Sequence, residues 1–365
     1  MSHPPIAIPA YNRPEALARL LASLAAAEYP AANIPLIVAI DAGGARGTAV
    51  REVAARFHWP HGPYEIIHHP TNVGLIGNVF FCGRLALQHG AVILLEDDLV
   101  VSRAFYDYAL QARAAYSADE RIAGCSLNAL WFHGTTHHPF VPYPDANDVF
   151  FMQVAWFQGQ LYTAAQWAAF EAWLARGDTA VSPTDGLHEL FGRFPPTDWF
   201  PIKMKYLVQT ERFYTFPRTS FTTNFGDVGT HFAQPTRWFQ VPLQHFARPW
   251  RMGGLDEAIA VYDSFQELLP SRLQPLTGRW AEYAPELDLY GSKSPANLRR
   301  PYVLTTKPCR RPLAQFGLQM WPLEANLEAA VPGHEISLCH RDEVEHGRLA
   351  LWRQRRTLKQ YFRRR

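Results

Sequence analysis

Hydrophobic and polar positions along residues 1–130 follow two patterns that alternate with each other. Short apolar runs without internal alternation predict strands that are buried on both faces. These runs occupy residues 6–8, 35–41, 64–69, 91–95 and 121–127. Between them, apolar residues recur every three or four positions, which predicts amphipathic helices. The helices are expected at residues 14–24, 47–57, 76–89 and 103–116.

Strands that alternate with helices predict an α/β fold, with a mostly parallel sheet and helices on both of its faces. In such a sheet, ligands bind at the carboxyl ends of the strands. Polar residues gather at those ends: Arg13 follows the first strand, Asp41 ends the second, Asn72 follows the third, and Glu96 to Asp98 end the fourth. We therefore expect the functional site on this rim of the sheet.

The rest of the chain differs in character from the first part. Residues 131–240 are rich in aromatic residues and prolines, and we expect them to form a second half packed against the sheet. Residues 241–345 show no periodicity that predicts regular structure, which makes them an irregular extension of unknown role. Residues 346–365 form a basic amphipathic tail with eight Lys or Arg and no acid.

Composition narrows the class of protein. The chain of 365 residues is 48% hydrophobic, which is typical of a globular protein with a sizeable core. Its net charge of +2 gives no overall case for nucleic-acid binding. The four cysteines have neither C-x-x-C nor zinc-finger spacing, so we expect buried, reduced thiols. We see no signal peptide and no apolar run of about 20 residues, so we expect a cytoplasmic protein.

Three consecutive acids, Glu96, Asp97 and Asp98, interrupt the apolar run VILLEDDLVV. Adjacent carboxylates repel one another, and burying one without a partner is costly. A divalent cation would offset that cost, because Mg²⁺ and Mn²⁺ bind one or two carboxylates together with water and substrate phosphates. If the strand continues through the acids, Glu96 and Asp98 share one side of it. The alternative is a solvated loop in which the acids cap the helix expected near residue 103.

Four segments of the chain together resemble a known family. They are AIPAYNRPEALARLLASL, IVAIDAGG, NVGLIGNVFFCGRLAL and VILLEDDLVVSRAFYDYAL, and they are similar to nucleotide-sugar glycosyltransferases of the GT-A fold. The opening resembles family-two transferases. The EDD segment is similar to the N-acetylglucosaminyltransferase I group, whose members use EDD as their DXD-type metal motif. The resemblance continues through TDWFPIKMKY and FPRTSFTTNFGDVGTHF, and residues 241–365 lie outside it.

The resemblance implies a role for each residue of the rim. Asp98 would be the direct metal ligand, Asp97 would support the ribose or the metal's water shell, and Glu96 would reach the donor sugar. Asp41 would accept a hydrogen bond from the uracil or the ribose, and Arg13 would lie against the diphosphate. The alternative for Asp41 is a turn acid, and that for Arg13 is a surface residue.

An inverting transferase also needs a general base that takes the proton from the acceptor hydroxyl. The resemblance points to Asp198, in TDWF, and an apolar setting would raise the pKa of its carboxyl toward a useful value. Asp185, in SPTDG, is the rival, and a structural salt bridge is the alternative for either acid. His231, in GDVGTHF, is a candidate metal ligand or phosphate contact, with a buried structural histidine as its alternative.

The basic tail is a candidate for peripheral contact with an anionic membrane. Leu351, Leu358 and Phe362 share one helical face, with Trp352 and Tyr361 beside it. Such a contact would suit an acceptor that is carried on a lipid. The alternative is a solvated basic helix or a disordered end.

We interpret the sequence as a metal-dependent, inverting hexosyl- or N-acetylhexosaminyltransferase with Mn²⁺ or Mg²⁺ as cofactor. Residues 1–130 would bind the UDP-sugar, and residues 131–240 would bind a glycan or lipid-linked acceptor. The product would be a bacterial surface polysaccharide or glycoconjugate. The protein would act in the cytoplasm or on the inner face of the cytoplasmic membrane, with no nucleic-acid partner.

Two other functions remain as alternatives. A nucleotidyltransferase acting on sugar phosphates also uses an acidic metal site, but it would want a glycine-rich basic loop after the first strand, where this chain has AYNRP. A non-catalytic carbohydrate-binding module would need aromatic and amide groups at a cleft. It would not need EDD, Asp41 and Arg13 together.

Overall fold

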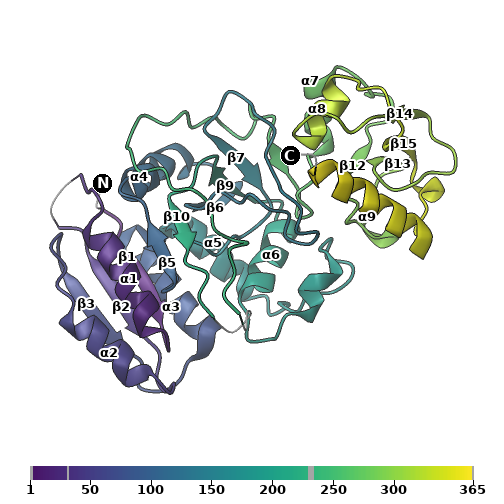
Figure 1. The fold of residues 1–365 in the computed structure, drawn as a ribbon. Helices are drawn as coiled ribbons and strands as arrows, with labels where there is room; N and C mark the ends of the chain where they lie inside the picture. Colours follow the sequence, from purple (N-terminus) through teal and green to yellow (C-terminus); the bar gives the residue numbers. More distant parts are fainter. Residues whose placement is uncertain (1–2, 31–32, 229–233, 364–365) are drawn as a thin grey trace. The chain divides into compact units, whose positions relative to one another are not determined.

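The computed structural model describes residues 3–30, 33–228 and 234–363, which form two compact units (Figure 1). The first unit comprises Met1–Leu130, Val154–Ala180 and Phe194–Met252. The second comprises Trp131–Gln153, Val181–Arg193 and Gly253–Arg365. The chain therefore passes from one unit to the other several times, and each unit is described by itself.

The first unit is built on a mostly parallel sheet, as the strand–helix alternation predicts. Its strands lie in the order β9-β6-β8-β4-β1-β2-β3. Their bounds are β1 (Ile6–Ala10), β2 (Leu36–Ile40), β3 (Tyr64–His68), β4 (Ala91–Leu94), β6 (Ile122–Ser126), β8 (Gln160–Thr163) and β9 (Phe213–Pro217). Strand β8 runs antiparallel to both of its neighbours, and the other pairs are parallel. Strands β1, β2 and β4 consist almost entirely of buried residues, which explains their unbroken apolar runs.

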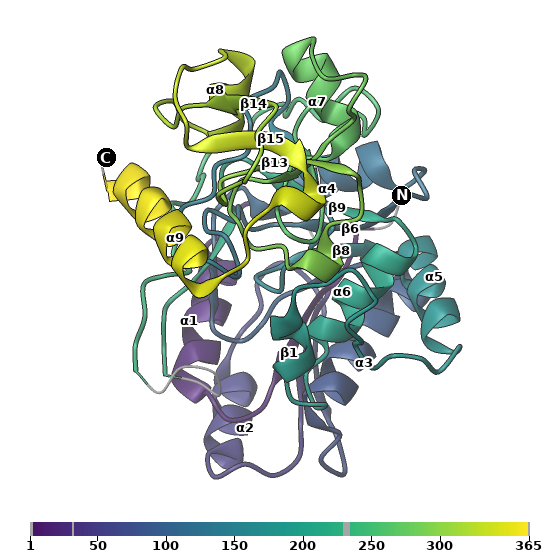
Figure 2. The same ribbon diagram turned by 90° about the vertical axis from the view of Figure 1, so that its right-hand side faces the viewer.

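The helices of this unit pack on the sheet and on one another (Figure 2). They are α1 (Pro14–Ala25), α2 (Gly47–Arg56), α3 (Gly74–His89), α4 (Phe105–Tyr116), α5 (Ala164–Leu174) and α6 (Phe200–Gln209). Pro14 starts α1, where its missing N–H costs nothing, and the leucines spaced along α1 are buried. Helix α3 approaches α5 closely at Gly83, because a Cβ atom there would collide with the ring of Trp167.

The second unit contains regular structure that the sequence pattern does not predict. A mixed sheet has the order β12-β13-β15-β14, and β7 pairs in parallel with β11. The strands are β7 (Val149–Met152), β11 (Val261–Tyr262), β12 (Glu286–Asp288), β13 (Tyr302–Thr305), β14 (Ala314–Phe316) and β15 (Ile336–His340). The helices are α7 (Pro270–Thr277), α8 (Leu323–Glu328) and α9 (Arg348–Arg363). Short strands of three to five residues carry too little periodicity to be found in residues 241–345.

Buried charges hold part of the second unit together. The Lys293 amine lies 2.8 Å from Asp263 and 3.4 Å from Glu286, and the Lys307 amine lies 2.8 Å from Asp288. Both lysines are almost fully buried. Because a buried charge is tolerated only with a partner, these pairs fix the positions of the segments that carry them.

The cysteines differ in part from the expectation of four reduced thiols. Cys309 and Cys339 form a disulfide within the second unit, whereas Cys82 and Cys125 are free and buried. Strand β15 brings Cys339 beside the segment that carries Cys309, although 30 residues separate them in the chain. Sequence spacing could not show that approach. No helix within the described residues is both long and apolar enough to cross a membrane.

Candidate active site

The three acids lie in a turn at the carboxyl end of β4. Strand β4 ends at Leu94, and Asp97 and Asp98 turn the chain into β5 (Leu99–Val101), with the Leu99 N–H donating to the Glu96 carbonyl at 3.3 Å. The expectation that Glu96 and Asp98 share one side of a strand is therefore wrong, because the strand has already ended. The acids also do not cap a helix, since β5 separates them from α4.

Arg13 is the partner of two of these acids. It stands between β1 and α1 and donates from Nη1 to Asp98 Oδ2 at 2.7 Å and from Nη2 to Asp97 Oδ1. Burial alone would lower the pKa of Arg13, but the charges of Asp97, Asp98 and Glu96 outweigh burial and raise it. Burial raises the pKa of Asp97 to about 6, although Arg13 acts in the opposite direction. Two strand ends are thus joined through one guanidinium.

Glu96 is the acid of the cluster that Arg13 does not contact. Its side chain has no hydrogen bond or ion pair among the described residues, and it is only partly exposed. Burial raises the pKa of its carboxyl well above the ordinary value, and the neighbouring charge of Asp98 adds to that shift. Asp198 contributes in the same direction, so its carboxylate acts on Glu96 through space. The fold therefore brings Asp198 into the field of the acid cluster from about a hundred residues away.

Asp198 itself is buried at the start of α6. Its Oδ1 accepts a hydrogen bond from the Phe200 N–H at 2.9 Å, which satisfies one of the free amides of the first turn. The structure thus gives this carboxylate a helix-capping contact in addition to its place near Glu96. Asp185 belongs to the second unit, where its carboxylate accepts from the Ser182 N–H at 2.7 Å.

Asp41 is buried at the end of β2 and binds the backbone of a neighbouring loop. Its carboxylate accepts from the N–H groups of Ala42 and Val73 at 2.8 Å and from that of Gly74 at 2.9 Å. A carboxylate offers about four lone-pair sites, so three amides leave room for about one more donor. The main task of Asp41 in this structure is to join the end of β2 to the start of α3.

A further pair of residues near the cluster escaped the sequence analysis. The Arg19 guanidinium forms an ion pair with Asp227 and lies 4.1 Å from the centre of the Phe225 ring. The Phe225 N–H donates to the Asp98 carbonyl at 3.3 Å, just after β10 (Thr222–Asn224) pairs with β5. These contacts hold the segment after β10 between α1 and the acids. The segment FGDVG, which contains Phe225 and Asp227, could have pointed to this contact, because it belongs to the resemblance. His231, which follows it in the sequence, lies outside the described residues.

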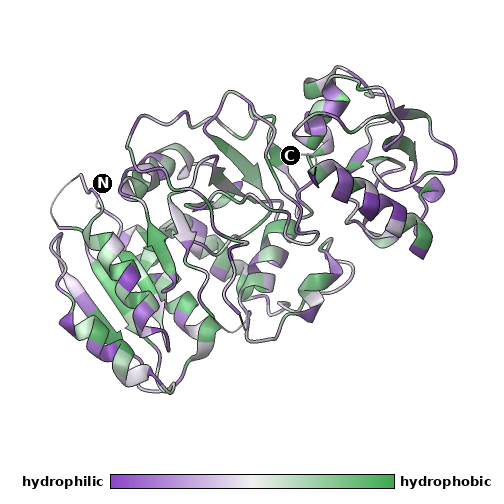
Figure 3. Ribbon diagram, viewed as in Figure 1, coloured by the Kyte–Doolittle hydropathy of each residue, from purple (hydrophilic) through white to green (hydrophobic). Residues whose placement is uncertain are grey.

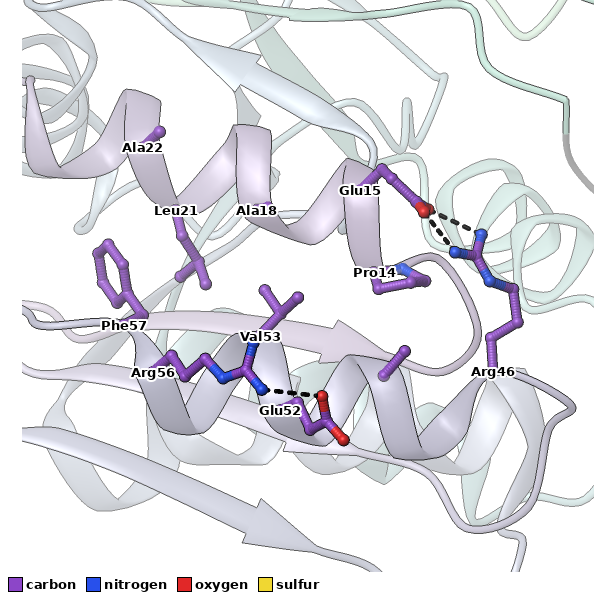
Figure 4. Close-up of a pocket in the computed structure, with 11 residues that line it drawn as sticks. Pro14, Glu15, Ala18, Leu21, Ala22, Arg46, Glu52, Val53, Arg56 and Phe57 are labelled. Carbon is purple, nitrogen blue, oxygen red and sulfur yellow. Dashed lines mark hydrogen bonds and ion pairs between the residues drawn. The ribbon is translucent and has the colours of Figure 1, made fainter.

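A groove of about 500 Å³ lies between α1 and α2 (Figure 4). Leu21, Val53 and Phe57 form part of its apolar lining. Ion pairs flank it, Glu15 with Arg46 and Glu52 with Arg56. The groove contains none of the carboxylates of the rim, so we do not assign the donor site to it.

The donor set at the turn suits a hard divalent cation. Among the residues that the structure describes, no three His, Cys, Asp or Glu side chains converge as a ready-made metal centre. Mg²⁺ and Mn²⁺ need only one or two carboxylates when substrate phosphates and water complete the shell. Asp97 and Asp98 offer those oxygens, and their two carboxylates outnumber the single guanidinium of Arg13 that contacts them. The residues present therefore fit such an ion.

Comparison with known protein families finds one match, over the first part of the chain. Residues 6–154 match the model of the family described as glycosyl transferase family 2, a stretch that contains Arg13, Asp41 and the three acids. The match covers less than half of the chain. No protein among the curated sequences matches.

Several solved structures share a distant likeness. The mannosyltransferase PcManGT from Pyrobaculum calidifontis, in complex with GDP-Man and Mn²⁺, is 14% identical with a TM-score of 0.33, over 49% of each chain. S. aureus TarS 1-349 in complex with UDP-GlcNAc is 12% identical with a TM-score of 0.36, over 74% of this chain and 63% of that one. The chain thus spans between about half and two thirds of their lengths. At these TM-scores the likeness carries no argument about function.

Proposed function

We propose that the protein is a metal-dependent, inverting glycosyltransferase that moves a sugar from a UDP-sugar to a glycan or lipid-linked acceptor. The observation that carries this proposal is the cluster of Asp97, Asp98 and Arg13 at the carboxyl ends of β1 and β4. It lies on the rim where parallel sheets bind ligands and within the residues that match the transferase family. Opposite charges at one place suit a diphosphate held together with a cation.

The exposed fractions of the Asp97, Asp98 and Arg13 side chains suggest a separate role for each. The Asp98 side chain is 20% exposed and that of Asp97 only 5%, so Asp98 is the better placed to bind an ion from solution. Arg13, with 36% of its side chain exposed, can reach a phosphate oxygen as well as the acids. Bound at Asp98, Mn²⁺ or Mg²⁺ would stabilise the negative charge that develops on the departing diphosphate.

Asp198 is the base that we propose for the transfer step. The acceptor hydroxyl attacks the anomeric carbon, its proton passes to a carboxylate oxygen of Asp198, and the bond from the anomeric carbon to the diphosphate breaks. UDP leaves with that electron pair, and the configuration of the sugar inverts in this single displacement. The Asp198 side chain is buried, and its charge contributes to the raised pKa of Glu96, which supports a place for this carboxylate near the acids.

The finer assignments belong to the same proposal. The transferred group would be a hexose or an N-acetylhexosamine, and the acceptor would belong to a bacterial surface polysaccharide or glycoconjugate. His231 would add a metal or phosphate contact from the segment after Asp227, and Asp41 would offer its remaining acceptor site to the nucleotide. Glu96 would contact the donor sugar.

Release of UDP from a panel of UDP-sugars, with Mn²⁺ and with water as the acceptor, tests this function. Wild type should release UDP from at least one donor. Asp198→Asn should still bind that donor but lose about a hundredfold or more in rate, because the proton acceptor is gone. Asp185→Asn is the matched control and should keep the wild-type rate. Unchanged turnover in Asp198→Asn would assign the base elsewhere, and the absence of any UDP release would favour a binding module.

A further inference from the structure

Helix α9 presents one face to solvent that carries cations and large apolar side chains but no acid. Ala350, Gln354 and Leu358 form its buried face within the second unit, and the Gln354 amide donates to the Tyr290 carbonyl at 3.2 Å. Residues that follow each other at intervals of three or four lie on one line of a helix. The line opposite the buried face consists of Arg348, Trp352, Arg356, Lys359 and Arg363, all of them exposed.

The packing of α9 changes which side chains can meet a membrane. The sequence suggested that Leu351, Leu358 and Phe362 form a lipid-facing surface, and the structure contradicts this for Leu358 and Phe362. Leu358 is buried, and Phe362 stacks on Tyr290 at a ring distance of 6.1 Å and meets the edge of Trp321 at 5.2 Å. The apolar face of the amphipathic helix is therefore used to attach it to the unit, and the cationic face is left outside.

The outer face is strongly and uniformly positive. Arg353 and Arg355 flank the line of cations, and the sequence of the helix contains no Asp or Glu. Hydrophilic residues predominate along α9 in Figure 3. None of these cations has an ion pair among the residues that the structure describes. Trp352 is 55% exposed and Leu349 is 61% exposed on the same side. The Arg356 guanidinium lies 5.5 Å from the centre of the Trp352 ring, so charge and apolar surface are side by side.

We propose that this face of α9 docks on an anionic lipid surface, with Trp352 and Leu349 entering the headgroup region. Each Lys or Arg near such a surface strengthens binding by about fivefold, and the effects multiply along a row of cations. An indole ring beside arginines is typical of the membrane interface, where the ring contacts the acyl chains and the guanidinium groups contact the lipid headgroups. A nucleic acid would use the cations but would leave Leu349 exposed.

The docking surface lies outside the donor rim, so it goes beyond the proposed transfer reaction. Anionic lipids give a membrane leaflet negative surface charge, which is the complement of this row of cations. A helix fixed to the second unit by its apolar face would hold the whole protein at that surface. The protein would then find a lipid-linked acceptor by diffusion along the membrane surface.

Flotation of the full chain with vesicles tests the proposal. The protein should float with phosphatidylcholine vesicles that contain about one quarter phosphatidylglycerol and stay behind with pure phosphatidylcholine. Replacing Arg348, Arg356 and Lys359 together with Gln should weaken that binding by about a hundredfold, as three lost cations predict. Trp352→Ala should weaken it further by removing the interfacial ring. All four side chains are exposed, so the variants should melt at the wild-type temperature.

A matched control removes the same charge from other surfaces. Arg51, Arg176 and Arg311 are exposed and lie outside α9, and changing all three to Gln should leave vesicle binding intact. The proposal is overturned if the control weakens flotation as much as the α9 variant, or if wild type does not float with anionic vesicles. Displacement of the protein from vesicles by a low concentration of single-stranded RNA would also overturn it, and would identify nucleic acid as the partner. UDP release in solution is a separate measurement, so its failure would not resemble a failure of docking.

Discussion

The Arg13 guanidinium donates from Nη1 to Asp98 Oδ2 at 2.7 Å, which joins the start of α1 to the turn after β4. The same group also holds Asp97. The rim therefore contains a cation of its own. Under the proposed function, a divalent ion would share these carboxylates with Arg13 or displace it, and a displaced Arg13 would turn toward a phosphate of the donor.

Arg13→Gln should make the stability of the protein depend on divalent cations. Loss of the guanidinium leaves Asp97 and Asp98 without their partner and should lower the free energy of unfolding by about 1 kcal/mol, a modest value because Arg13 is partly exposed. Mn²⁺ should restore most of that loss, since a cation replaces the missing charge. Urea unfolding with and without Mn²⁺ measures both effects.

Arg46→Gln is the matched control for Arg13, because it breaks an exposed ion pair with Glu15 on the same unit. Its free energy of unfolding should equal that of wild type, both with and without Mn²⁺. If Mn²⁺ stabilised Arg13→Gln no more than it stabilised the control, the acids would not be a cation site.

Asp41→Asn should destabilise the protein in the absence of any nucleotide. The amide keeps one acceptor oxygen where the carboxylate serves three backbone N–H groups, so one or two of those donors lose their partner. The expected loss is about 1–3 kcal/mol. Thermal unfolding would show this loss. Glu52→Gln, which changes an exposed acid on α2, is the control. Equal stability in the two variants would mean that Asp41 serves the nucleotide and not the fold.

Lys203 is a buried lysine whose replacement should not harm the fold. Its amine lies among the rings of Tyr162, Trp167 and Phe170, at 3.5 Å from the centre of Phe170. Burial lowers the pKa of this amine well below its ordinary value of 10.5. Lys203→Met should therefore be as stable as wild type or more stable at neutral pH, because no charge or free amine has to be desolvated.

The pH dependence of Lys203→Met gives a second test. Between the lowered pKa of the folded state and 10.5, the unfolded chain binds a proton that the folded one does not, so wild-type stability rises with pH in that window. The advantage of Lys203→Met over wild type should shrink as pH rises. Lys205→Met, on the same helix, removes an amine that lies 3.0 Å from Asp178 and should be destabilising instead. A gain that grows with pH would contradict the lowered pKa.

The thiol count should distinguish the two cysteine pairs. Denatured protein alkylated without reductant should expose the thiols of Cys82 and Cys125 alone, and reduction should add those of Cys309 and Cys339. The disulfide closes a loop of 30 residues, so reduction should lower the free energy of unfolding by about 3.6 kcal/mol. Mass spectrometry of the alkylated chain gives the count, and four reactive thiols before reduction would contradict the pairing.

The alternation of strands and helices in residues 1–130 was predictable because each element has its own hydrophobic period and most strand pairs there are parallel. Strand β8 and the small sheet of the second unit were not, because short strands and distant pairings leave little trace in local sequence. The acids were predicted as site residues because three carboxylates follow an apolar strand. Their turn was missed, because nothing in VILLEDDLVV marks where β4 ends.

The contacts of single side chains were the least predictable part of the site. Arg13 was expected against a diphosphate, and in the structure it contacts two carboxylates, which are the nearest opposite charges. Asp41 was expected at the nucleotide, and three backbone amides use most of its capacity. In both cases contacts come from segments distant in the sequence, which the local pattern does not reveal.

Calorimetric titration of UDP into the protein, with and without Mn²⁺, tests the central claim most directly. Binding should require Mn²⁺ and should disappear in Asp98→Asn, whereas Asp107→Asn on α4, whose carboxylate accepts a local bond from Gln111, should bind like wild type. At a hundredfold excess over Kd, bound UDP should also raise the free energy of unfolding by about 2.7 kcal/mol. UDP binding that ignores both Mn²⁺ and Asp98, or no binding at all, would contradict a metal-dependent donor site at the turn after β4.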